Sequence, residues 1–163
     1  MTITPASLMD IAVGVRSFLL PHWHRWHALW GPPEPATPSQ WTCMRSSLLL
    51  ARVFERCGIR AVIRSGRSRY DADCVPMDRG LFAAGTWESH AWIEVAGFVV
   101  DITADQFGHA PVVMTSACNP TYRAADDQRY QLPQTPAALA AVDAIWPLWR
   151  DSEIGKAGDQ ISG

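Results

Sequence analysis

Residues 89–101 read SHAWIEVAGFVVD, and this stretch decides the fold of the chain. It covers most of two runs, 88–95 and 98–103, that are rich in branched and aromatic residues. Only Ala96-Gly97 separates the two runs. Branched and aromatic residues favour strands, and a dipeptide that ends in glycine suits a tight turn. The pattern therefore predicts two antiparallel strands joined by a two-residue hairpin turn.

The length of this turn determines where two polar side chains lie. With a two-residue turn, Val95 pairs with Phe98, and Trp92 faces Asp101. Because side chains alternate between the faces of a strand, His90, Trp92 and Asp101 share one face. His90 and Asp101 are then diagonal neighbours, within reach of a carboxylate–imidazole hydrogen bond. A three-residue turn would send Asp101 to the opposite face.

A cysteine opens the helix that is predicted upstream of the hairpin. Thr42 can cap this helix, which runs from Cys43 to about Cys57 and ends at Gly58. Its apolar stripe is formed by Met44, Leu48, Ala51 and Phe54/Glu55, and it is widened by Leu49, Leu50 and Val53. A helix this apolar should be central and buried. Its N-terminus, together with a nearby imidazolium, would lower the pKa of the Cys43 thiol and favour the nucleophilic thiolate.

Other helices and short strands are predicted around this centre. In chain order they are a helix over 5–20 that Pro21 stops, a short helix over 21–30, a proline-rich loop over 31–39, a strand over 59–64, a polar loop over 65–80 that could lie over a cleft, a strand over 111–114, and a helix over 135–146 that Pro147 ends or kinks. The predicted fold class is α+β, with the cysteine-bearing helix packed on an antiparallel sheet. We expect a single domain over 1–150, in which 1–40 form a helical N-terminal extension, and a disordered tail over 151–163.

Composition disfavours several functional classes. The chain has 163 residues, is 48% hydrophobic and carries a formal net charge of −2. It therefore has no general attraction to nucleic acid or to an anionic membrane, and no segment is apolar enough to span a bilayer. The four cysteines are widely spaced and contain no CxxC pair, which disfavours a disulfide framework and a zinc knuckle. We expect a cytoplasmic protein without metal or cofactor, and the oligomeric state stays open.

Cys43, His90 and Asp101 supply, in that order, a nucleophile, a general base and acid, and a group that orients the imidazole. Gln40 could donate its side-chain amide to an oxyanion hole, and Trp41 and Trp92 are candidate substrate-binding aromatics. The expected reaction is hydrolysis of a peptide or amide bond through a thioester acyl-enzyme, with a peptide or protein as the substrate.

The same segments resemble a known superfamily. Cys43 at the start of an apolar helix, HAWIEV at 90–95 and VDIT at 100–103 are similar to the transglutaminase-like superfamily, which has a papain-like fold. The similarity runs from about Trp41 to Gln106. The helix start CMRSSLL also resembles the leader peptidases of lasso-peptide biosynthesis. The resemblance implies attack by the cysteine on a peptide or glutamine amide, proton transfer by the histidine, an orienting aspartate, and no metal.

Two further functions remain open. The same triad could transfer the acyl group to an amine or deamidate glutamine, although Thr42 stands where crosslinking transglutaminases carry Gln. The chain could also be a peptide-binding module that keeps the fold without turnover. Residues 43–80 carry eight arginines against four acidic residues, and these arginines are either a solvated face or a rim that attracts an acidic peptide.

Other residue sets are possible as well. His109 and Cys118 have the right types for a second dyad, and Asp105 could replace Asp101 as the orienting group. A cluster of histidines before the proline-rich loop could bind a metal, or could pack among the tryptophans there; its members are His22, His24 and His27.

Overall fold

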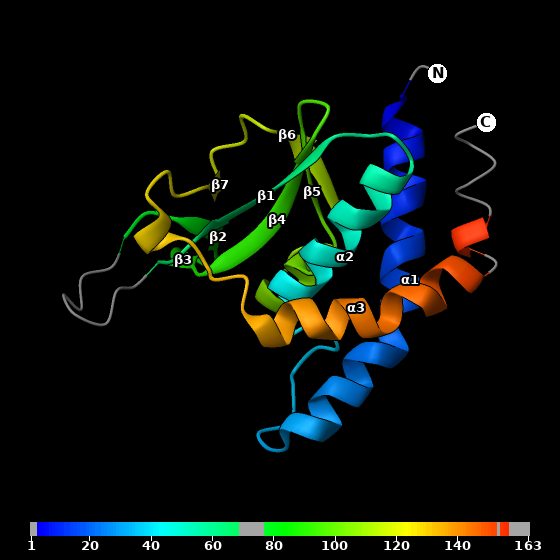
Figure 1. The fold of residues 1–163 in the computed structure, drawn as a ribbon. Coiled ribbons are helices and arrows are strands. Elements are labelled where there is room, and N and C mark those ends of the chain that lie inside the picture. The colour runs from blue at the N-terminus through cyan, green and yellow to red at the C-terminus, as the bar shows by residue number, and fades with distance from the viewer. Residues whose placement is uncertain (1–2, 69–76, 153, 157–163) are drawn as a thin grey trace.

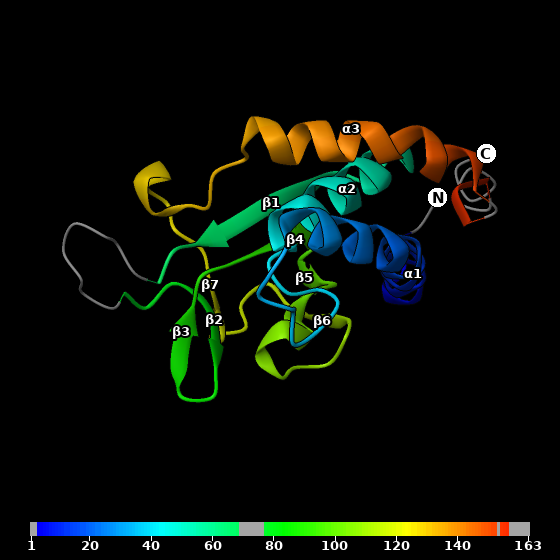
Figure 2. The ribbon, with the colours of Figure 1, turned by 90° about the horizontal axis from the view of Figure 1, so that it is seen from below.

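The structure is a computed structural model, and it describes residues 3–68, 77–152 and 154–156. Helices cover antiparallel strands in an α+β fold, as the sequence predicts (Figures 1 and 2). The elements are α1 (Pro5–Trp30), α2 (Cys43–Arg56), β1 (Ala61–Gly66), β2 (Gly80–Ala83), β3 (Thr86–Glu88), β4 (His90–Val95), β5 (Phe98–Asp101), the 3-10 helix η1 (Ala104–Phe107), β6 (Val113–Ser116), β7 (Tyr122–Arg123), the 3-10 helix η2 (Gln128–Tyr130) and α3 (Pro136–Asp151).

The β4–β5 hairpin has the predicted two-residue turn. Val95 pairs with Phe98, and Ile93 pairs with Val100. Ala96 and Gly97 have φ angles of 49° and 82°, the left-handed values that a two-residue turn of type I′ requires at both central positions. The register places His90 and Asp101 on the same face of the hairpin, and this geometric prediction is confirmed by their direct contact.

Two sheets meet beside this hairpin. The larger one has the strand order β1-β4-β5-β6, and the smaller one has the order β3-β2-β7. Only Ser89 separates β3 from β4, so the chain passes from the smaller sheet into the larger one just before His90. The sequence did not predict β2 or β7, and β7, with two residues, is too short to show a hydrophobic period.

Helix α2 lies against β1 and β4, with α1 and α3 on its flanks (Figure 1). Its buried face includes Leu49, Leu50, Val53 and Phe54, whereas Met44 and Leu48 are only half-buried. The predicted central position of this helix is therefore confirmed, and its most buried apolar residues include the three that were expected to widen the stripe.

Two prolines lie inside helices instead of ending them. Helix α1 runs through Pro21, which corrects the prediction of two separate helices, and it bends part-way along its length (Figure 1). Proline removes one intrahelical hydrogen bond, but tertiary packing on both sides of the bend keeps the helix continuous: Leu19 and Trp23 are both fully buried. Helix α3 likewise runs through Pro147 to Asp151.

Some predictions fall outside the described residues. Residues 69–76 of the predicted polar loop and residues 157–163 of the predicted tail are among these. In the described part of that tail, Asp151 is the last residue of α3 and residues 154–156 are helical, so the prediction of disorder is wrong for these residues. No helix among the described residues combines the length and the apolar character needed to cross a membrane.

Candidate functional site

Cys43 is the first residue of α2, as predicted, and is half-buried. Thr42 occupies the N-cap position, but its hydroxyl does not cap the helix. It donates instead to the Ser39 carbonyl oxygen at 2.7 Å. The N–H groups of the first turn therefore have no side-chain cap, and they stay available to a developing negative charge beside Cys43.

The residue before Thr42 has an unusual backbone. Trp41 has a φ of 63°, the left-handed region that bulky residues avoid, and it is 49% exposed. Such conformations persist only where surrounding contacts impose them. Here His27 of α1 provides one, because its Nε2 lies 2.8 Å from the Gln40 carbonyl oxygen, and its ring packs edge-on against Trp41.

A second contact fastens the same loop to the rest of the fold. The Arg16 guanidinium of α1 donates to both carboxylate oxygens of Asp105, at 3.1 and 2.7 Å. Asp105 in turn accepts a short 2.5 Å hydrogen bond from the Ser39 hydroxyl. Arg16 also donates to the carbonyl oxygen of Ile102 at 2.6 Å. Asp105 thus holds the loop before Cys43, and its contacts do not support the alternative in which it orients His90.

His90 and Asp101 form a fully buried pair. His90 Nε2 lies 2.7 Å from Asp101 Oδ2, and the two residues are 0% and 1% exposed. The other carboxylate oxygen, Oδ1, accepts the Thr103 amide N–H at 2.9 Å and the Thr103 hydroxyl at 3.2 Å. The ring is also packed between Trp92 and Phe107, with centroid separations of 6.3 and 5.2 Å. The orientation of the ring is therefore fixed by Asp101 at its Nε2 edge and by packing against these two aromatic side chains.

The electrostatics of the pair favour the charged imidazole. Burial opposes the charge on His90, but the Asp101 carboxylate, its hydrogen bond and the Cys43 side chain raise the pKa of His90 to about 10. Burial likewise opposes the charge on Asp101, and His90 with the other hydrogen-bond donors lowers the pKa of Asp101 below its usual value. Both shifts describe an imidazolium–carboxylate ion pair at neutral pH.

The second nitrogen of the His90 ring, Nδ1, faces away from Asp101. His90 Nδ1 is buried and makes no hydrogen bond within the described part of the chain. The Cys43 thiol interacts with the His90 ring, and this interaction contributes to the raised pKa of His90. The structure therefore brings together all three residues of the predicted triad, from α2, β4 and β5.

Tyr122 is a fourth member of this network, and the sequence did not predict it. The Tyr122 hydroxyl donates to Asp101 Oδ2 at 2.9 Å, on the same oxygen that His90 contacts. Burial and the Asp101 charge raise the pKa of Tyr122 above its usual value, so this group stays a neutral donor. Tyr122 belongs to the two-residue strand β7. No local sequence pattern predicts such a strand, and only the tertiary structure places it next to Asp101.

Removing the Tyr122 hydroxyl is expected to destabilise the protein. Tyr122→Phe deletes a hydrogen bond to a buried carboxylate, and such bonds contribute about 1.5–3 kcal/mol to the free energy of unfolding. Urea unfolding of the wild type and of the variant measures this difference. A loss below about 0.5 kcal/mol, with an unchanged dependence on urea concentration, would mean that the carboxylate does not depend on this donor.

A cavity of about 540 Å³ opens beside Cys43. Gln40 and Trp41 line it with Cys43, in agreement with their predicted positions near the nucleophile. The Gln40 side-chain oxygen accepts the Ala36 N–H at 2.6 Å, and its Nε2 makes no hydrogen bond with the described residues. Trp92 differs from the expectation, because it is 1% exposed and packs beneath His90 instead of lining the cavity.

The rival residue sets are not assembled. His109 Nε2 contacts the Phe82 carbonyl oxygen at 3.3 Å, and Cys118 is exposed in the turn after β6. His22 packs against Phe18 and Trp26, and His27 holds the Gln40 carbonyl. Among the residues that the structure describes, no three side chains of the metal-binding types come together.

Comparison of the chain with protein-family models, with curated proteins and with solved structures found no match.

Proposed function

We propose that the protein is a cysteine hydrolase of peptide or amide bonds, with Cys43 as nucleophile, His90 as general acid and base, and Asp101 as the group that orients His90. The observation that carries this proposal is the buried His90–Asp101 pair, at 2.7 Å, on the hairpin next to a cysteine at an uncapped helix N-terminus. A cysteine-bearing helix on an antiparallel sheet that carries the histidine and aspartate is also the arrangement that a papain-like, transglutaminase-like fold would have.

The charges of the site suit thiolate chemistry. An imidazolium beside a thiol favours the thiolate, and the raised His90 pKa keeps the imidazole protonated at neutral pH. The thiolate attacks the amide carbonyl carbon. The oxyanion that forms can accept hydrogen bonds from first-turn N–H groups of α2 and from the Gln40 side-chain amide, Nε2. His90 Nδ1 then gives its proton to the leaving amine, and the C–N bond breaks to leave a thioester on Cys43.

Hydrolysis completes the cycle. His90, now neutral, takes a proton from a water molecule that attacks the thioester carbonyl carbon. The carboxylic acid product leaves, and the thiolate–imidazolium pair is restored. An amine in place of water would give acyl transfer, so the residues of the triad do not separate hydrolysis from transfer. Turnover of amide substrates with and without an added primary amine separates the two reactions by their products.

Alkylation with iodoacetamide at pH 6 tests the central claim. An ordinary thiol is only about 0.3% ionised at this pH, whereas a thiol paired with an imidazolium is largely thiolate. We expect Cys43 to be modified at least about tenfold faster than Cys118, which is exposed and serves as the internal reference. Mass spectrometry of the digested protein measures both rates. Equal and slow labelling of the two cysteines would favour a peptide-binding module without turnover.

A further inference from the structure

The cavity beside Cys43 has one charged side chain among its described lining residues, the carboxylate of Glu88. Glu88 is the last residue of β3, and in the chain only Ser89 separates it from His90. The nucleophile and the carboxylate therefore border the same space, of about 540 Å³.

Glu88 has no cationic partner within the described ranges of the chain. Its Oε1 accepts the Thr86 hydroxyl at 2.9 Å, and its Oε2 makes no hydrogen bond or ion pair with the described residues. Other carboxylates of the protein do have such partners, at 2.6–3.5 Å; these ion pairs are Arg16–Asp105, Arg52–Asp143, Arg64–Glu94, Arg123–Asp78 and Arg129–Asp127. The negative charge of Glu88 is thus available to a ligand in the cavity.

A guanidinium that approaches β3 lies on its other face. Arg123 is placed over the Trp87 ring, 4.9 Å from the centroid, and it pairs with Asp78 at 3.5 Å. Because side chains alternate between the two faces of a strand, Trp87 and Glu88 point to opposite faces of β3. Arg123 therefore does not neutralise the carboxylate in the cavity.

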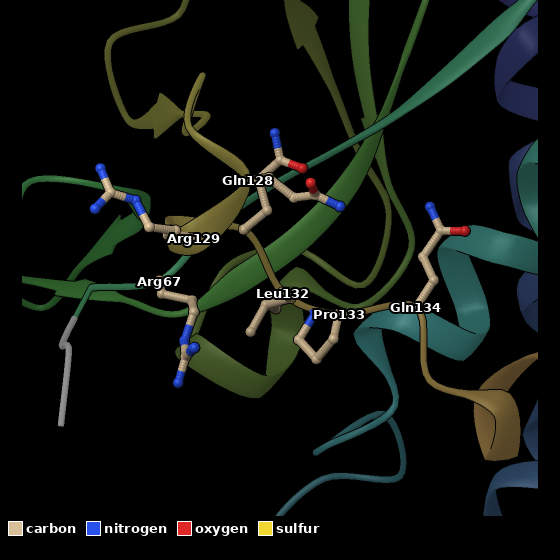
Figure 3. A pocket seen from close by; sticks show the side chains of 7 residues that line it. Arg67, Gln128, Arg129, Leu132, Pro133 and Gln134 are labelled. Carbon is tan, nitrogen blue, oxygen red and sulfur yellow. The ribbon is translucent and has the colours of Figure 1, made fainter.

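The neighbouring cavity has a different lining (Figure 3). It measures about 640 Å³, and Leu132 lines both cavities. Its charged members are Arg67 and Arg129, and no carboxylate is among its described lining residues. Of the described residues that line the two cavities, the one that can pair with a cation therefore lies on the side of Cys43.

Aromatic rings border the same cavity as Glu88. Trp41 is 49% exposed, and Phe107 is half-buried. Tryptophan rings of this protein accept guanidinium groups elsewhere, since Arg45 lies 4.8 Å from the Trp30 ring centroid. A lysine or arginine side chain can place its alkyl stem or its charged head against such rings.

We propose that the cavity beside Cys43 binds a lysine or arginine side chain of a peptide substrate, close to the scissile amide, and that the Glu88 carboxylate selects this side chain. An ammonium or guanidinium group pairs with a carboxylate through charge-assisted hydrogen bonds. Trp41 adds aromatic surface for the same side chain. The proposal deepens the proposed function and rests on it for the reaction, whereas recognition of the cation is measurable without turnover.

The test measures binding to the full-length Cys43→Ala protein by fluorescence anisotropy. The probes are short peptides of Gly, Ala and Gln with an uncharged fluorophore at the N-terminus and an amidated C-terminus. One position at a time carries Lys, and matched peptides carry Gln, Glu or norleucine there; norleucine keeps an unbranched alkyl chain without the charge. At low ionic strength we expect at least one Lys peptide to bind at least about fivefold more tightly than its Gln and norleucine counterparts.

Substitutions of Glu88 in the same Cys43→Ala protein should change this preference. Glu88→Gln can still accept the Thr86 hydroxyl, and it is expected to bring the affinities of the Lys and Gln peptides within about twofold of each other. Glu88→Lys should reverse the order, so that the Glu peptide binds more tightly than the Lys peptide. Glu55→Gln is the matched control, because it changes the net charge equally and Glu55 is exposed near the end of α2 opposite to Cys43; it should keep the preference.

Several results would overturn the proposal. They are equal affinity of the Lys and Gln peptides for the Cys43→Ala protein, a Lys preference that survives Glu88→Gln, and no measurable binding of any Lys peptide up to about 1 mM. A preference that Glu55→Gln removes as completely as Glu88→Gln would reflect net charge alone and would overturn it as well.

These outcomes are independent of the catalytic proposal. A Lys preference that depends on Glu88, in a protein whose Cys43 is not selectively alkylated, would support the cation site and contradict the hydrolase. Selective alkylation of Cys43 without any Lys preference would support the thiolate and overturn the cation site.

Discussion

Cys43→Ala is expected to lower the turnover of an amide substrate by about 10⁴–10⁶-fold, since removal of a nucleophile abolishes the covalent route. The first-turn N–H groups of α2 and the His90–Asp101 pair stay in place, so substrate binding should be kept. Steady-state kinetics on a fluorogenic amide substrate measures the loss. The thermal midpoint should change little, because the side chain is small and half-buried.

Cys118→Ala is the matched control for this substitution. Cys118 is exposed in the turn after β6, and its replacement should leave the rate within about twofold. Turnover by Cys43→Ala above about a tenth of the wild-type rate would show that another group is the nucleophile.

Asp101→Ala is expected to reduce the free energy of unfolding by about 3–5 kcal/mol, because it leaves a buried imidazole without its charged partner. It also removes the acceptor of four hydrogen bonds, from His90, Tyr122 and two groups of Thr103. The rate of amide hydrolysis should fall by about 10³–10⁴-fold, since the imidazole loses its orientation. Urea unfolding and steady-state kinetics measure the two effects.

Asp143→Ala is the control on the surface. Asp143 forms an ion pair with Arg52 at the same 2.7 Å distance, but its side chain is 70% exposed. Exposed pairs of this kind contribute about 0–1 kcal/mol. Similar losses of stability for Asp101→Ala and Asp143→Ala would contradict the buried ion pair.

The pH dependence of stability distinguishes the charged pair from simple packing. The pKa of His90 is raised to about 10 in the folded protein, against about 6.5 for an unfolded histidine. Its contribution is therefore complete below about pH 6.5 and is lost as the pH rises towards 10, by up to about 1.4 kcal/mol per pH unit. The wild type should show this decline, and Asp101→Ala should lack most of it. Parallel stability curves for the two proteins over this range would rule out a protonated His90.

The features that depend on local periodicity could be predicted from the sequence. The turn at Ala96-Gly97 and the alternation of side chains along two strands were sufficient to place His90 beside Asp101. The start of the cysteine-bearing helix followed from its capping position and apolar stripe. The features that were missed depend on contacts between distant segments. Tyr122 reaches Asp101 from a two-residue strand, and no pattern in the sequence marks it.

Two errors have simple physical causes. Pro21 was expected to end a helix, but packing of the residues on both sides outweighs the one lost hydrogen bond. Trp92 was a candidate for substrate binding, yet the face that it shares with His90 is covered by the smaller sheet. Tyr122 of β7 packs on the Trp92 ring with a centroid separation of 5.2 Å. Strand parity identifies a face but not what lies over it.

Helix α1 has a consequence for protein engineering. It supplies Arg16 to Asp105 and His27 to the Gln40 carbonyl, so the backbone that presents the reactive sulfur is braced by the first thirty residues. A shortened version beginning after the proline-rich loop would leave a half-buried carboxylate and a backbone oxygen without these donors. A minimal domain for expression or design therefore has to include α1, although the triad itself lies entirely downstream of it.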